Sequence, residues 1–112
     1  MAIDQTNVVD FIGIDPEGDE AQLIITDRLG WNEGEEQDLK HMYLLQEKVN
    51  SYIGFIESGE IFTTYPKARG KKIIVRVVAK HEMNDGGKDF FKKIEGALLA
   101  SGHLITFECL RT

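Results

Sequence analysis

The feature that most constrains the fold of this chain is a long amphipathic helix predicted over residues 32–59. Asn32 followed by Glu35 matches a capping box, in which the cap side chain accepts a first-turn N–H and the glutamate reaches back to the cap. Ser58-Gly59 is typical of a helix end, because glycine adopts the left-handed conformation without a Cβ penalty. The apolar residues recur at spacings of three and four, so they share one face that requires a partner surface: Leu39, Met42, Leu45, Val49, Ile53 and Ile56.

Strand patterns lie on both sides of this helix. Residues 8–15 and 21–27 predict an antiparallel hairpin, because the Asp15-Pro16-Glu17-Gly18 segment between them has strong turn chemistry. After the helix, residues 60–65 predict a short extended segment. The nearly continuous β-branched run in residues 71–80 predicts a central strand that is covered on both faces or nearly so.

The last third of the chain predicts a second helix and a final strand. The helix begins with a cap at Asn84 or Asp85 and runs to about Ser101, where Gly102 ends it, and residues 103–110 alternate as a strand. The element order β-β-α-β-α-β predicts an α+β fold: a two-layer sandwich with a four-stranded mixed sheet and two helices on one face. The strand order stays open.

Length and composition indicate one domain over residues 1–112, with 1–7 as a loose N-terminal segment. The chain contains no apolar run of the ~20 residues that a membrane-spanning helix needs, and its start does not resemble a signal peptide. Cys109 is the only cysteine, which excludes an intrachain disulfide and fits a reducing compartment. We therefore expect a cytoplasmic location and no contact with a membrane.

Charge is distributed unevenly between the two halves of the chain. Residues 1–60 carry 14 acidic and 3 basic side chains, whereas residues 61–112 carry 5 acidic and 10 basic ones. The two halves can attract each other within the domain, or the acidic half can form a surface for a cationic protein partner. The net charge of −6 argues against nucleic acid, despite the basic cluster in residues 67–72.

Patterns typical of catalytic or metal sites are absent from the sequence. The histidines His41, His81 and His103 do not stand at metal-ligand spacing, and His41 is expected near the polar side of the long helix. Cys109 falls on the inward phase of the last strand beside Phe107, which favours core packing over reactivity. No glycine-rich phosphate loop occurs, so we expect neither a metal nor a cofactor.

Two groups of residues are candidates for binding. On a helical wheel, Leu44 and Phe55 fall almost opposite the apolar stripe, near Lys48 and Ser51. Single exposed apolar residues are normal and the N-terminal segment can cover them; the alternative is that the ridge docks a second copy or another protein. The other candidate is an anion or ligand face on the open side of the sheet, formed by Asp10, Asp27, Arg76 and Lys80.

Several segments resemble a family of small, uncharacterised bacterial proteins. The resemblance covers roughly residues 8–80 and lies in Val8–Asp15, Asp27–Trp31, Leu44–Ile61 and Lys72–Val78. The family is a domain of unknown function, so the resemblance implies the α+β fold and supplies no activity or catalytic residue.

The sequence thus favours a non-enzymatic interaction domain, homodimeric or binding a cationic protein partner. The alternative is a small-molecule or anion-binding protein, or an enzyme, that uses the open sheet face.

Overall fold

The computed structural model describes residues 11–14 and 17–110. Its elements follow the predicted order with one short helix and one 3-10 turn added: β1 (Phe11–Ile14), β2 (Glu20–Asp27), α1 (Glu35–Glu57), α2 (Glu60–Thr64), η2 (Pro66–Ala68), β3 (Lys72–Ala79), α3 (Asp85–Ala100) and β4 (Leu104–Cys109). Residues 8–10, 15 and 16 of the predicted hairpin lie outside the described residues.

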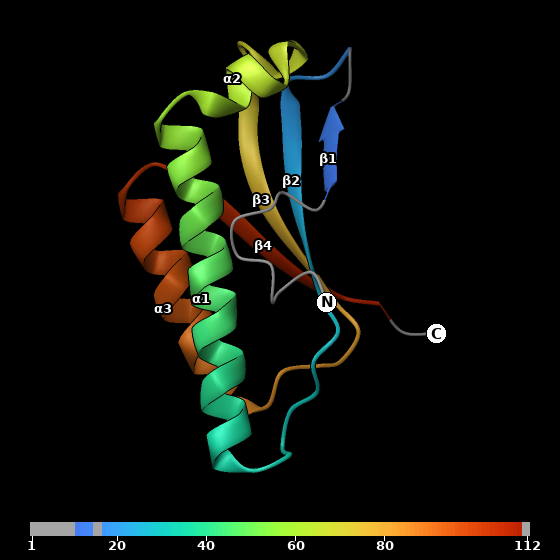
Figure 1. Ribbon diagram of the computed structural model, residues 1–112, viewed down its shortest axis with the longest axis vertical. Helices are drawn as coiled ribbons and strands as arrows, with labels where there is room; N and C mark the ends of the chain where they lie inside the picture. The colour runs from blue at the N-terminus through green and yellow to red at the C-terminus, as the bar shows by residue number, and fades with distance from the viewer. Residues whose placement is uncertain (1–10, 15–16, 111–112) are drawn as a thin grey trace.

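The strands form one open sheet in chain order, β1-β2-β3-β4. β1 pairs antiparallel with β2, whereas β2, β3 and β4 are parallel. Helices α1 and α3 lie side by side against one face of this sheet, and α2 sits at one end of it (Figure 1). The predicted two-layer α+β fold is therefore confirmed. Among the described residues, no helix is long and apolar enough to cross a membrane.

The core lies between the sheet and the two long helices. Alternate residues of β2 and β3 are buried, as expected for strands with one face against helices. The fully or nearly fully buried apolar side chains of the strands and long helices are Ala21, Leu23, Ile25, Leu45, Val49, Tyr52, Val75, Val77, Ala79, Phe91, Ile94 and Ile105.

The start of α1 differs from the predicted capping box. The N-cap is Gly34, at φ 112°, and its lack of a side chain leaves the cap without a side-chain hydrogen bond. Asn32 instead takes a left-handed conformation at φ 65°, and its N–H donates to Asp38 Oδ1 at 3.0 Å. The carboxylate of Asp38, one turn inside the helix, accepts the Asn32 N–H, which Glu35 would accept in the capping box. The predicted end is confirmed: Ser58 is the C-cap and Gly59 has φ 79°.

The buried stripe of α1 is also rotated from the predicted one. Leu39 is 58% exposed, whereas the helix buries His41, Leu45, Lys48, Val49 and Tyr52. Hydrophobicity alone predicted the wrong centre for this stripe, because three of the buried side chains have polar groups. Buried polar groups are tolerated where they find partners; the hydroxyl of Tyr52 donates to the Ile24 carbonyl at 3.0 Å.

The predicted extended segment at residues 60–65 is the helix α2. Its β-branched residues favoured a strand, but the local geometry starts a helix. Ser58 Oγ accepts the N–H of Glu60 at 3.2 Å, directly after the left-handed Gly59. Ile61 is then fully buried, which anchors the short helix at the end of the sheet.

The second predicted helix is confirmed as α3. Its cap is Asn84, whose side chain accepts from the Gly87 N–H at 2.8 Å. The amide nitrogen of Asn84 donates to Asn32 Oδ1 and to Asp38 Oδ2, both at 2.9 Å. This small network joins the starts of α1 and α3.

Candidate functional site

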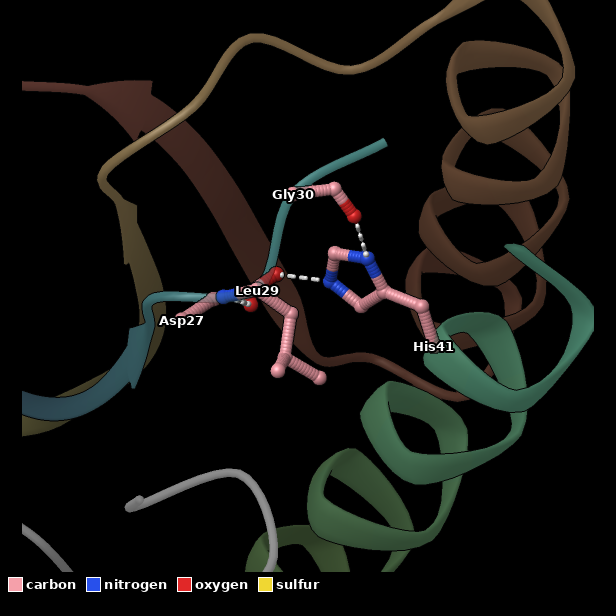
Figure 2. Close-up of polar contacts among 4 residues, drawn as sticks. All are labelled: Asp27, Leu29, Gly30 and His41. Atoms are coloured by element: carbon pink, nitrogen blue, oxygen red, sulfur yellow. Dashed lines mark hydrogen bonds and ion pairs between the residues drawn. The ribbon is translucent and has the colours of Figure 1, made fainter. Parts of the chain in front are cut away.

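A buried ionisable pair lies where β2 ends and α1 begins. Asp27 is 1% exposed and His41 is 2% exposed, and His41 Nε2 lies 2.6 Å from Asp27 Oδ2. The other oxygen of Asp27 accepts from the Leu29 N–H at 3.1 Å, and His41 Nδ1 lies 3.1 Å from the Gly30 carbonyl oxygen (Figure 2). Trp31 stacks on the imidazole, with ring centroids 3.9 Å apart.

The hydrogen bonds of this pair fix its number of protons. The Gly30 carbonyl only accepts, so His41 Nδ1 must carry a proton and donate. The 2.6 Å contact between Nε2 and Oδ2 must then hold a second proton, on the imidazole or on the carboxyl group. Either placement leaves the pair without net charge. This neutrality lowers the cost of burying both groups.

Both ring nitrogens of His41 are therefore engaged inside the protein. A general base needs a nitrogen within reach of a substrate proton. The cavity beside the ring has a volume of about 160 Å³, below the range typical of ligand pockets. This geometry suits a structural link between β2 and α1 and gives His41 no proton-transfer role as placed.

The pair was not predicted as a pair. His41 was expected near the polar side of the helix, and this was wrong because Asp27 offers it a buried partner. Two signals point to the pair in retrospect: Asp27 continues the inward phase of Ala21, Leu23 and Ile25, and His41 lies four residues before the buried Leu45.

The sheet has a second face that neither long helix covers, which we call the helix-free face. Strand alternation and register place there Glu20, Gln22, Ile24 and Thr26 of β2, Lys72, Ile74, Arg76 and Val78 of β3, and Leu104, Thr106 and Glu108 of β4. Arg76 forms an ion pair with Glu108, and its other terminal nitrogen donates to Gln22 Oε1 at 3.3 Å. Ile24, Ile74, Val78 and Leu104 are partly exposed and lie outside the core cluster of the described residues.

The predicted anion face is only partly assembled. Arg76 is on the helix-free face and is neutralised by Glu108, whereas the Asp27 carboxylate is buried on the helix side. Expecting these two groups on one face was wrong, because Asp27 and Arg76 have opposite phases in paired strands. Lys80 follows β3 and is exposed; Asp10 lies outside the described residues.

The predicted exposed ridge on α1 is not an exposed ridge. Leu44 and Phe55 are partly buried and pack against the core cluster, and Ser51 is partly buried. Lys48 is fully buried, with its ammonium group 5.5 Å from the centroid of the Tyr52 ring. The ridge was placed opposite the predicted stripe, so the rotation of that stripe carries these side chains to a flank of the helix instead.

The remaining candidate groups stand apart from each other. Cys109 has the predicted inward register, opposite Ala79, but stays partly exposed with its thiol 3.7 Å from the Lys80 carbonyl oxygen. His103 Nε2 lies 3.3 Å from a carboxylate oxygen of Glu57. Within residues 11–14 and 17–110, no group of three His, Cys, Asp or Glu side chains is placed to hold a metal ion.

Comparison with known proteins places the chain in a family. Residues 1–111 match the model of a family of unknown function, DUF6572, and the chain belongs to that family. No curated protein and no solved structure matches the chain.

Proposed function

We propose that this member of an uncharacterised family is a non-enzymatic interaction domain that pairs with a second copy of itself through the helix-free face. The observation that carries the proposal is the aliphatic surface of its parallel strands. Entirely parallel sheets occur almost only where both faces are covered. Here three parallel strands have helices on one side and present Ile24, Ile74, Val78 and Leu104 on the other.

The charges on this face favour a second copy over a cationic partner. The strand residues of the face carry two acidic side chains, Glu20 and Glu108, and two basic ones, Lys72 and Arg76. A balanced face does not repel its own copy, although the whole chain carries −6. Arg76 and Glu108 already pair within each chain, so a two-fold interface brings two neutral pairs together and buries no unpaired charge from them.

The size of the face predicts a weak dimer. The four strands have 4, 8, 8 and 6 residues, which at about 3.3 Å per residue and about 4.8 Å between strands gives a footprint of roughly 400 Å². Stable interfaces bury about 800 Å² per partner, so association at micromolar or higher concentration is expected rather than a permanent dimer.

The test is solution mass by light scattering behind gel filtration, from micromolar to millimolar protein. The wild-type mass should rise with concentration from the chain mass of 12.7 kDa toward twice that value. Thr106→Arg places a large cation on the exposed middle of the edge strand β4, beside Arg76, and should keep the chain monomeric, whereas Thr63→Arg, the same change on α2, should not.

A wild-type chain that stays monomeric at millimolar concentration would overturn the dimer. So would a dimer that persists in Thr106→Arg and in a second variant, Leu104→Glu, once circular dichroism shows both to be folded. In that case a cationic partner for the exposed carboxylates Glu33, Glu35 and Glu36 at the start of α1 becomes the function to examine.

A further inference from the structure

The parallel strands end level with one another, so the residues that directly follow them, Arg28, Lys80 and Leu110, stand in a row. Asp27 is opposite Ala79, and Ala79 is opposite Cys109. The ladders continue one residue further, because Lys80 N donates to the Asp27 carbonyl and Leu110 N to the Ala79 carbonyl, both at 2.8 Å. By strand alternation Arg28, Lys80 and Leu110 therefore follow the phase of the helix-free face.

This row borders a cavity of about 370 Å³. The cavity is lined by Thr26, Asp27, Arg28, Val78, Ala79, Lys80 and Leu110. The volume lies at the lower end of the range for small-molecule sites. The cavity lies at the carboxyl ends of β2 and β3.

The two cations of the cavity are not used elsewhere in the described part of the chain. Arg28 and Lys80 are exposed, and neither side chain has a hydrogen-bond or ion-pair partner among the described residues. Acidic side chains outnumber basic ones in this protein, 19 to 13, so most cations have acidic side chains available as partners, and two unpaired cations on one cavity indicate a site for an anion. Asp27 does not neutralise these two cations, because it is paired with His41 and the Asp27–His41 pair has no net charge.

The rest of the cavity is largely apolar. Val78 contributes an aliphatic wall, and Leu110 is 56% exposed beside Lys80. An anion with a hydrocarbon portion matches both parts of the site: the charged head meets Arg28 and Lys80, and the tail contacts Val78 and Leu110.

We infer that the cavity at the carboxyl ends of β2 and β3 binds a small carboxylate with an apolar tail. Arg28 and Lys80 hold the carboxylate, and Leu110 covers the tail. The site adjoins the proposed dimer contact and shares Thr26 and Val78 with it, but Arg28, Lys80 and Leu110 lie beyond the strand residues of that face, and hexanoate binding by the monomer tests the site separately.

Titration followed by amide NMR shifts tests this site, with hexanoate as the probe and hexan-1-ol and inorganic phosphate as comparators. Hexanoate should shift the amides around Arg28, Lys80 and Leu110 and bind more tightly than either comparator, which each supply only half of the interaction. Arg28→Gln and Lys80→Gln should each weaken hexanoate about fivefold, the upper range for an exposed charge contact. The double variant should abolish the localised shifts.

The matched control is Lys93→Gln, on the exposed side of α3 away from the cavity, which should bind as the wild type does. Thr106→Arg should also retain hexanoate binding. Equal affinity of the wild type and the double variant, or shifts scattered over the surface, would overturn the site. Phosphate binding more tightly than hexanoate would overturn the ligand class.

Discussion

At the scale of single residues, the buried Asp27–His41 pair is the polar contact whose loss should lower the unfolding free energy most. Asp27→Ala removes one partner and leaves His41 Nε2 buried without a hydrogen-bond partner, which is expected to cost about 3–5 kcal/mol of unfolding free energy. Asp27→Asn keeps an acceptor for the Leu29 N–H and should cost less, about 1–3 kcal/mol. Urea denaturation measures both values.

The control for this pair is Glu57→Ala, which removes the carboxylate beside His103. Glu57 is 59% exposed, so its loss should change the unfolding free energy by less than about 1 kcal/mol. Comparable losses in Asp27→Ala and Glu57→Ala would show that the buried pair contributes no more than a surface contact.

At the scale of elements, two glycines of α3 provide a matched comparison. A Cβ at Gly87 would lie 3.0 Å from the Trp31 ring and 3.2 Å from Met83, whereas a Cβ at Gly96 would meet nothing within 4 Å. Alanine favours a helix over glycine by about 1 kcal/mol, so Gly96→Ala should stabilise the protein by up to that amount. Gly87→Ala should destabilise it by about 1–3 kcal/mol through overpacking.

Thermal unfolding of these two variants measures the shifts in opposite directions. The chain has a single tryptophan, so its fluorescence also reports whether Gly87→Ala moves the Trp31 ring. If both substitutions stabilise the protein, Trp31 does not pack against Gly87 as tightly as the structure indicates.

The elements also show what the sequence can predict. Alternation, turn residues and caps predicted β2, β3, β4 and α3 closely, because each is a local property of the chain. The rotation of α1 was not predictable from hydrophobicity. It depends on which side chains find polar partners across the fold, as His41 does at Asp27. α2 was missed because Ser58 and Gly59 outweigh the strand propensity of Ile61 and its neighbours.

At the scale of the whole molecule, the candidate sites depend on strand order and register. Lys80 was predicted as a ligand residue on the open sheet face, because it alternates out of its strand. Its neighbour Arg28 was not, because only the parallel register of β2 and β3 brings the two cations onto one cavity. The same register separates Asp27 from Arg76, which the sequence had grouped. The local patterns of the sequence were therefore predictable, whereas the long-range pairing of the strands was not.

The proposed dimer makes a prediction about the stability of the whole molecule. A partner that binds only the folded chain stabilises it by mass action, so the unfolding midpoint should rise with protein concentration. Above the dissociation constant, each tenfold increase adds about 1.4 kcal/mol per dimer, about 0.7 kcal/mol per chain. This corresponds to a rise of roughly 3 °C for a domain of this size.

Differential scanning fluorimetry over two decades of concentration measures this rise. The wild type and Thr63→Arg should show it, whereas Thr106→Arg should unfold at one temperature throughout, because its helix-free face no longer pairs. An equal rise in all three proteins would place the association on another surface. A flat midpoint in the wild type up to millimolar protein would mean that the aliphatic face of the parallel strands does not bind a second copy.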